Sequence, residues 1–358
     1  MKYRFLIILI FSFSACIMSC KNSSDPTPSK TSTSTYMVTT LAGSSTAGFI
    51  NGTGQSAEFN HPSGIAVDGD GNIYIADRLN HVIRKIFSTG EVTTFAGSGT
   101  AGYADATGIA AQFNFPTGVA VDKDGNVYVA DQGNQLIRKI TSGGAVSTLA
   151  GQAGTSGTAD GMGSLAQFNA PTGVAVDASG NVFVADQGNN RIRIVTSSGS
   201  VSTLAGSSGG YMDGTGTGAQ FQNPVALVLD AHGNIYVTDQ YNYKIRMVTS
   251  LGVVSTIAGS IQGYANATGT AAKFGSLFGI SIDAGGNLYV ADQTNNTIRK
   301  ITSAGVVSTF AGSGIPGTTN GVSTSALFIA PAGIAFDING NLYIAEYNGQ
   351  TIRKITAQ

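Results

Sequence analysis

Acidic and basic residues recur in this sequence seven positions apart, beginning with Asp77 and Arg84. Carboxylates beside guanidinium groups could form a ring of catalytic acids and bases, or they could be ion pairs inside the fold. General acid–base catalysis uses groups in unlike environments, whereas these copies have nearly identical surroundings. The sequence therefore predicts structural ion pairs. They are Asp77–Arg84, Asp131–Arg138, Asp186–Arg193, Asp239–Arg246, Asp292–Arg299 and Glu346–Arg353.

Amides and aromatic residues gather in the segments around these pairs. Such side chains donate, accept and stack, which suits a neutral polar ligand such as a glycan or an extended peptide. The alternative is ordinary turn chemistry, in which Asn serves the left-handed backbone position. The fourth copy departs most from the others, also at Ala226 and Thr238, and the first copy comes second. The candidate ligand-binding residues are Gln240, Tyr241, Asn242, Tyr243, Arg78, His81, Tyr103, Tyr211 and Tyr264.

The sequence predicts no metal site, no cofactor and no catalytic triad. Its only histidines are His61, His81 and His232, and no two have a spacing that aims both at one ion. Asp68 begins a segment that resembles half of a calcium loop, but the further oxygen ligands do not recur in the other copies. We expect Asp68 and its counterparts to accept backbone N–H groups in hairpin turns. The counterparts are Asp122, Asp177, Asp230, Asp283 and Asp337.

All of these residues belong to an internal repeat of about 54 positions. Each copy has four short apolar or β-branched runs that end in Gly, Asn or Asp, as strands do. Small four-stranded sheets repeated in this way are typical of β-propellers, because each sheet must stack on its neighbours to bury its faces. The copies are marked by Pro62, Pro116, Pro171, Pro224 and Pro331, and by Leu277 in place of a proline.

The two ends of the repeat are incomplete in complementary ways. The last copy stops after its third strand, and an unmatched fourth strand at residues 38–43 precedes the first copy. We therefore predict an all-β fold, a six-bladed β-propeller of four-stranded antiparallel blades. Its ring is closed by the strand at 38–43, which completes the last blade and removes exposed sheet edges.

The connections between copies also repeat. Asp105 has the position of an N-cap before a short helical turn. Phe113 ends the same segment and is expected to be a plug between blades. The counterparts of Asp105 are Asn51, Asp160, Asp213, Asn266 and Asn320, and those of Phe113 are Phe59, Phe168, Phe221, Phe274 and Phe328.

Three motifs of the first copy carry a family resemblance: PSGIAVD at 62–68, GNIYIAD at 71–77 and NHVIRKI at 80–86. They resemble the NHL repeat, and the resemblance covers residues 38–355. It implies the propeller fold but no single function. Propellers of this family include RNA-binding and protein-binding modules, an amidating lyase with a histidine-liganded metal, and bacterial surface proteins.

The N-terminus resembles a bacterial lipoprotein signal at residues 1–19. Lys2 and Arg4 precede an apolar run that is too short to span a bilayer. Lipidation is expected at Cys20, with Cys16 as the alternative. Residues 20–35 are rich in Ser, Thr and Pro and predict a flexible tether. The propeller at 36–358 therefore contains no cysteine and no disulfide.

The net charge of −1 and the lack of a basic stripe argue against nucleic-acid binding. We expect an exported, monomeric propeller, lipid-anchored to the bacterial cell envelope in the periplasm or at the surface. Its predicted role is a non-enzymatic binding or scaffold module for a protein or glycan. The ligand would bind the top face, which carries the loops between second and third strands. The alternative is a metal-dependent lactonase- or lyase-like enzyme.

Overall fold

The computed structural model describes Met1 and residues 35–358, and Thr35–Gln358 forms one compact unit. The expected signal and tether, with Cys16 and Cys20, lie outside the described residues except at their outermost ends. In the described part of the chain, no helix is long and apolar enough to cross a membrane.

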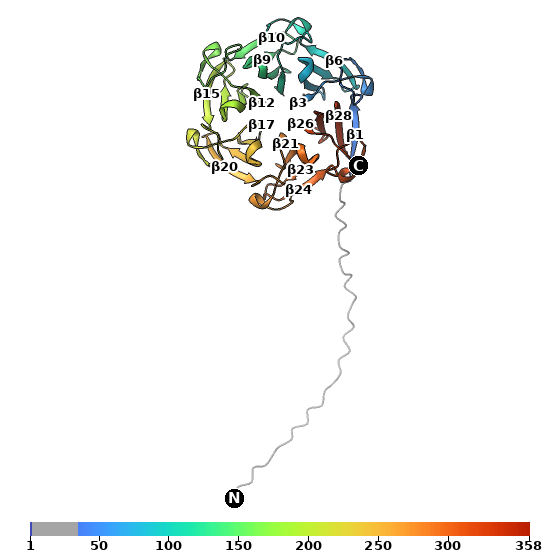
Figure 1. The fold of residues 1–358 in the computed structure, drawn as a ribbon, viewed down its shortest axis with the longest axis vertical. Helices are drawn as coiled ribbons and strands as arrows, with labels where there is room; N and C mark the ends of the chain where they lie inside the picture. The colour runs from blue at the N-terminus through green and yellow to red at the C-terminus, as the bar shows by residue number, and fades with distance from the viewer. Residues whose placement is uncertain (2–34) are drawn as a thin grey trace, which may run out of the picture. The chain divides into compact units, whose positions relative to one another are not determined.

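Six antiparallel sheets surround one axis as blades, which confirms the predicted propeller (Figure 1). We name the strands of each blade a to d from the axis outward. The a strands are β3 (Pro62–Val67), β7 (Pro116–Val121), β12 (Pro171–Val176), β17 (Pro224–Leu229), β21 (Leu277–Ile282) and β26 (Pro331–Phe336). The b strands are β4 (Ile73–Asp77), β8 (Val127–Asp131), β13 (Val182–Asp186), β18 (Ile235–Asp239), β22 (Leu288–Asp292) and β27 (Leu342–Glu346).

The outer half of each blade is formed by strands c and d. The c strands are β5 (Val82–Ile86), β9 (Leu136–Ile140), β14 (Arg191–Val195), β19 (Lys244–Val248), β23 (Thr297–Ile301) and β28 (Thr351–Ala357). The d strands are β6 (Glu91–Ala96), β10 (Val146–Ala150), β15 (Ser200–Ala205), β20 (Val253–Ala258), β24 (Val307–Ala311) and β1 (Tyr36–Ala42).

The ring is closed by the N-terminal strand, as predicted. Strand β1 pairs antiparallel with β28, so that Tyr36 lies opposite Ala357 and Val38 lies opposite Ile355. Figure 1 shows the blue β1 beside the red β28, although the two strands come from opposite ends of the described chain. The observed strand, Tyr36–Ala42, starts before the predicted range of 38–43.

Four blades differ from the predicted four strands, because a two-residue strand from a d–a connection pairs with strand d. In the other two blades, single bridges between Thr107 and Ala145 and between Thr268 and Val306 take its place. These segments cover part of the outer edge of each blade. The fifth strands are β2 (Gly52–Thr53), β11 (Gly161–Met162), β16 (Gly214–Thr215) and β25 (Gly321–Val322).

The apolar core lies between neighbouring blades. Tyr74 and Ala76 of the first blade pack with Phe113 and Val129 of the second, and all four are buried. Alternation along the strands gives every blade two apolar faces, and each face needs a neighbour to cover it. The predicted phenylalanine plugs are confirmed, because Phe113 and its five counterparts are fully buried.

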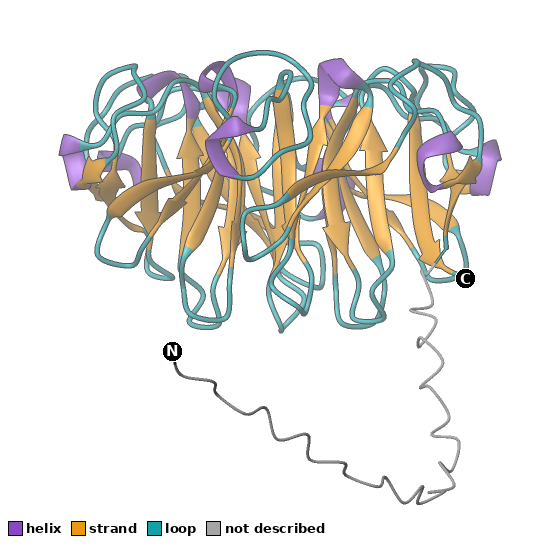
Figure 2. Cartoon of the chain, turned by 90° about the horizontal axis from the view of Figure 1, so that it is seen from below, coloured by secondary structure: helices purple, strands orange, loops and turns teal. Residues whose placement is uncertain are grey.

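Short 3-10 helices occur in two kinds of loop, and Figure 2 shows them toward the upper face and the outer rim. We call the face with the b–c loops the top face, and the face with the a–b and c–d turns the bottom face. The b–c loops contain η2 (Arg78–Asn80), η4 (Gln132–Asn134), η6 (Gln187–Asn189), η8 (Gln240–Asn242) and η10 (Gln293–Asn295). The d–a connections contain η1 (Gly54–Ser56), η3 (Gly108–Ala110), η5 (Gly163–Leu165), η7 (Gly216–Gly218), η9 (Gly269–Ala271) and η11 (Ser323–Ser325).

Candidate functional site

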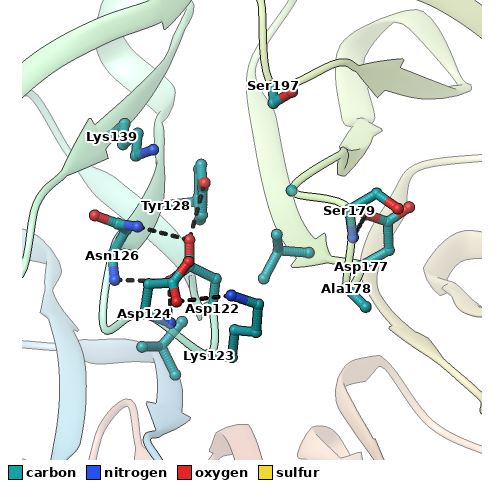
Figure 3. A pocket seen from close by; sticks show the side chains of 13 residues that line it. Asp122, Lys123, Asp124, Asn126, Tyr128, Lys139, Asp177, Ala178, Ser179 and Ser197 are labelled. Carbon is teal, nitrogen blue, oxygen red and sulfur yellow. Dashed lines mark hydrogen bonds and ion pairs between the residues drawn. The ribbon is translucent and has the colours of Figure 1, made fainter.

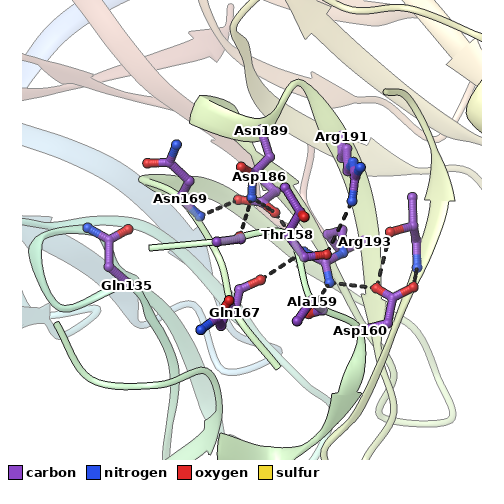
Figure 4. A network of polar contacts seen from close by, with 12 residues as sticks. Gln135, Thr158, Ala159, Asp160, Gln167, Asn169, Asp186, Asn189, Arg191 and Arg193 are labelled. Carbon is purple, nitrogen blue, oxygen red and sulfur yellow. Dashed lines mark hydrogen bonds and ion pairs between the residues drawn. The ribbon is translucent and has the colours of Figure 1, made fainter. Parts of the chain in front are cut away.

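A buried arginine organises the polar interior of each blade, as the third blade shows in Figure 4. Arg193 and Asp186 are both fully buried, and Nη1 of the arginine donates to Oδ2 of the aspartate at 2.7 Å. The same carboxylate oxygen accepts from the Asn189 amide at 2.8 Å, and the other accepts from the Asn169 backbone N–H at 2.8 Å. The aspartate is thus fixed on both oxygens by groups of the fold.

The structure forms this ion pair in all six blades, at the positions that the spacing of seven indicates. Burial raises the pKa of Asp77 to about 6, although the Arg84 charge and hydrogen bonds oppose the shift. A phenylalanine plug covers each arginine, and in the third blade the Arg193 guanidinium carbon lies 5.2 Å from the centre of the Phe168 ring. The ion-pair distances lie between 2.7 and 3.0 Å for Arg84–Asp77, Arg138–Asp131, Arg193–Asp186, Arg246–Asp239, Arg299–Asp292 and Arg353–Glu346.

The N-cap prediction for Asp105 is wrong. The N-cap of η3 is Thr107, and it makes no side-chain capping bond. Asp105 instead accepts from Arg138 Nη2 at 2.6 Å and from the Thr148 backbone N–H at 3.0 Å. It is a second acceptor for the buried arginine, because a guanidinium has more donors than one carboxylate can satisfy. An Asp or Asn lies 33 positions before the arginine in every copy, and this regularity could have revealed the contact.

The first residue after each b strand is not part of these ion pairs, and several of these residues contact their equivalents in the neighbouring blades. Nη2 of Arg78 donates to Gln132 Oε1 at 2.9 Å, and Nη1 donates to the Tyr347 hydroxyl at 3.2 Å. Gln132 in turn donates to Gln187 Oε1 at 3.5 Å. Blades diverge with distance from the axis, so contacts between equivalent side chains of neighbouring blades place these groups near the axis. We call the six residues the top-face ring: Arg78, Gln132, Gln187, Gln240, Gln293 and Tyr347.

Aromatic residues and histidines surround Arg78. Its guanidinium carbon lies 5.1 Å from the centre of the Phe115 ring, and the His81 ring packs edge-on against the same phenylalanine. The His61 ring packs against Tyr347, with 4.6 Å between centres. Burial and the Arg78 charge lower the pKa of both histidines. Both imidazoles are therefore neutral near pH 7.

Comparison with known proteins agrees with this architecture. Residues 59–86, 113–140 and 168–195 match the family described as NHL repeat. The chain is also 29% identical over 283 residues to NHL repeat-containing protein 2 of Bos taurus. The chain contains NHL repeats. The match covers 68% of this NHL-repeat chain but only 39% of the cattle protein. A further match, 41% identical over 91 residues, is to Protein SUPPRESSOR OF QUENCHING 1 of Arabidopsis thaliana, and it spans 25% of this chain and 9% of the plant protein.

Two solved structures illustrate the range of propellers that share the fold. One is an auxiliary nutrient binding protein from Bacteroides thetaiotaomicron, with 16% identity and a TM-score of 0.69. The alignment covers 90% of this NHL-repeat chain and 76% of that protein. The other is a catalytically inactive virginiamycin B lyase from Staphylococcus aureus with Quinupristin, with 18% identity and a TM-score of 0.57. That alignment covers 90% and 99% of the two chains.

In this NHL-repeat propeller the candidate residues of the fourth blade divide into two groups. Asn242 is buried, and its amide donates to Asp239 at 2.7 Å and to the Gly210 carbonyl at 2.6 Å. We therefore correct its assignment: Asn242 belongs to the polar interior of the blade and is not available to a ligand. Gln240 is also largely buried and accepts from Asn223. Tyr241 is 56% exposed.

The other candidate tyrosines lie on the d–a connections. Tyr103 stacks over Arg138 at 5.1 Å, and Tyr264 over Arg299 at 4.6 Å, so each covers a buried arginine in addition to its phenylalanine plug. Their hydroxyls bond to Thr148 and Thr309 of the d strands. Tyr211 has the Lys244 ammonium over its ring at 5.1 Å. The structure thus brings Arg78 and His81 together, but places these tyrosines over the outer strands.

The predicted ligand-binding residues do not include four neighbours of Arg78, namely His61, Phe115, Gln132 and Tyr347. One signal was available, because Tyr347 is the only aromatic residue at a position that is Gln in four copies. Among residues 35–358, no three His, Cys, Asp or Glu side chains are grouped as a metal site requires. The guanidinium of Arg78, the hydroxyl of Tyr347 and the amide of Gln132 are groups that can bind and orient polar ligands.

A cavity of about 440 Å³ lies on the bottom face between the second and third blades (Figure 3). The Asp122 carboxylate in this cavity already accepts hydrogen bonds from residues of the adjoining turn and strand. Asp122 accepts the backbone N–H groups of Asp124 and Asn126, at 3.0 and 2.9 Å, and the Tyr128 hydroxyl at 3.2 Å. The predicted capping role of Asp122 is thus confirmed. Burial alone would raise the pKa of Asp122, but these hydrogen bonds hold it below its usual range. Because Asp122 is engaged in these turn contacts, whereas Arg78 has only neutral partners, the top face is the better candidate.

Proposed function

We propose that this NHL-repeat propeller is a non-enzymatic binding module of the bacterial cell envelope, with its ligand on the top face. The observation that carries the proposal is the top-face ring. Polar groups inside the blades repeat six times and are occupied by structural bonds, whereas the ring changes from Gln to Arg78 and Tyr347 at neighbouring positions. Binding sites require such asymmetry, because a ligand without sixfold symmetry meets each blade differently.

The comparisons support an envelope location. Solved propellers of the same fold are described as auxiliary nutrient binding proteins of Bacteroides species. The proposal includes a lipid anchor at Cys20, a monomeric propeller, a glycan or protein partner and no cofactor. Gln358 N–H donates to the Thr35 carbonyl at 2.7 Å, so the chain enters the propeller beside the C-terminus on the bottom face.

A glycan array and cross-linking to envelope proteins, both with the labelled full chain, test this function. A top-face variant combining Arg78→Gln and Tyr241→Ala should lose the signal. A bottom-face control, Lys123→Gln, should keep it, because Lys123 is exposed and pairs only with Asp124. Empty results in both screens, or equal loss of signal in the control, would overturn the proposal.

A lyase- or lactonase-like activity is the second candidate, because His61 packs against Tyr347 and His81 against Phe115, and Arg78 contacts both of these aromatic residues. Imidazoles at a cationic, aromatic-lined face are suitable proton acceptors. A stoichiometric divalent ion in the purified full chain, with a chelator-sensitive activity on a lactone or cyclic peptide ester, would favour it. Metal analysis without such an ion would leave the binding module as the better account.

A further inference from the structure

Arg78 is the one cation of the top-face ring, and its partners are neutral. The guanidinium is held by the Tyr347 hydroxyl, the Gln132 amide oxygen and the face of Phe115. Within residues 35–358, no carboxylate forms an ion pair with it. The six interior arginines behave differently, because each is paired with a carboxylate within 3.0 Å. A half-buried guanidinium held in place without a counter-charge is prepared for an anion from outside.

We propose that the top-face ring binds an acidic saccharide, with Arg78 taking a sugar carboxylate. This inference rests on the proposed binding function and names its ligand class. The planar guanidinium matches a carboxylate with parallel N–H donors, which a lysine in the same place could not do. Tyr347 and Gln132 restrict the guanidinium to one orientation, so less rotational freedom is lost when the anion binds.

The neighbours of Arg78 favour a saccharide over an acidic peptide. Amides of Gln132 and Gln187 and the Tyr347 hydroxyl both donate and accept, as sugar hydroxyls require. His61 and His81 add neutral donors and acceptors, because burial and Arg78 lower the pKa of both. The Phe115 ring, 36% exposed, supplies an apolar surface for a sugar ring.

Calorimetric titration of the full chain with three probes tests the inference: trigalacturonate, its trimethyl ester and triaspartate. The acid should bind at least about ten-fold more tightly than the ester, because hydrogen bonds to charged groups are the stronger ones. Arg78→Gln should lower the affinity for the acid to that for the ester. This variant gives the first blade the residue that blades two to five already have, so the fold should tolerate it. The control, Arg191→Gln, removes another top-face charge and should leave binding unchanged.

Each outcome decides between these alternatives. Equal binding of acid and ester, or an Arg78→Gln variant with unchanged affinity for the acid, overturns the carboxylate contact and leaves the binding function standing. Tighter binding of triaspartate than of trigalacturonate overturns the saccharide class. No binding of any probe overturns the inference, while the array and cross-linking screens test the binding function separately. If Arg78→Gln fails to fold, the comparison of acid with ester on the unaltered chain decides alone.

Discussion

The junction between the fourth and fifth blades differs from the other five junctions. At those five junctions, a glycine of strand a lies so close to the backbone of the next blade that there is no room for a Cβ atom. A Cβ at Gly118 would lie 2.2 Å from the Thr172 carbonyl oxygen. The fourth blade has Ala226 there. The Thr238 hydroxyl accepts the Ala226 N–H at 2.9 Å and donates to the Phe278 carbonyl at 2.7 Å, so it bridges the two blades. The five glycines are Gly64, Gly118, Gly173, Gly279 and Gly333.

A second contact also changes at this junction. Elsewhere the last residue of a b–c loop accepts the N–H of the residue before the next strand a, as Gln135 does from Ala170 at 2.6 Å. Ala170 has a φ of 49°, a left-handed conformation that L residues adopt at a cost. We call the junction between the fourth and fifth blades the exceptional junction. There the last residue of the b–c loop is Tyr243, and the Ser276 N–H donates instead to Thr294 of its own blade.

The comparison gives a structural reason for the departures of the fourth blade. Its departures at Ala226, Thr238 and Tyr243 form one set of compensating changes at a blade junction. Conspicuous sequence differences can therefore be structural. The asymmetry on which the proposed function rests lies instead in the top-face ring, where Arg78 changes one side chain without altering the junction beneath it. The following predictions test whether the junction between the fourth and fifth blades differs from the others while the polar interior of the blades is the same throughout.

The largest effect is expected for removal of an interior arginine. Arg84→Met should cost about 3–5 kcal/mol in the free energy of unfolding, because it leaves the Asp77 carboxylate buried without its partner. Arg246→Met should cost the same, since the interior of the fourth blade is unchanged. Chemical denaturation of the full chain measures both. A much milder Arg246→Met would show that the exceptional junction extends into the blade.

The same variant has a predicted pH dependence. Burial raises the pKa of Asp77 to about 6 from 3.8. The stability that this carboxyl contributes is therefore present below its unfolded pKa and lost as pH rises through about 6. In Arg84→Met the opposing charge is gone, so the pKa rises further. The loss in free energy of unfolding caused by Arg84→Met should be largest at pH 8 and should become smaller toward pH 5. A defect that grows on acidification would contradict this assignment.

Exchanging Gly and Ala at the junctions should have the next largest effect. Gly118→Ala should cost about 1–3 kcal/mol, because the new methyl group meets a neighbouring backbone that cannot retreat. Ala226→Gly is the matched reverse change and should cost less than about 1 kcal/mol. Melting temperatures of the two variants give the ordering, and equal losses would remove the distinction between the junctions.

Removal of the Thr238 hydroxyl should destabilise only the exceptional junction. Thr238→Val keeps the shape of the side chain but leaves the Ala226 N–H and the Phe278 carbonyl without their partner. The expected loss is about 1–3 kcal/mol. Thr238→Ser keeps the hydroxyl and should lose less stability. If the valine variant is as stable as the serine variant, the bridge does not compensate for Ala226.

Much of the fold could be predicted because a propeller repeats its contacts between nearest neighbours. The same order and spacing of strands recurs in all six copies, and this was enough to place β1 in the last blade and to pair Asp77 with Arg84. The site was less accessible to the sequence. Arg78 and Tyr347 are 269 positions apart and meet only when the ring closes. The residue type of Asp105 suggests a helix N-cap. Asp105 instead accepts a hydrogen bond from Arg138, because the guanidinium has more donors than Asp131 can satisfy.

The smallest predicted effect concerns the loop contact at the five similar junctions. Gln135→Met removes the acceptor of the Ala170 N–H while keeping the length of the side chain, and it should cost about 1 kcal/mol. Amide hydrogen exchange should be faster at Ala170 and unchanged at Ser276, whose N–H is bonded within its own blade. Tyr243→Phe is the control at the exceptional junction and should change neither amide. Faster exchange at both amides would mean that the junctions open together, because the ring then responds as one cooperative unit rather than blade by blade.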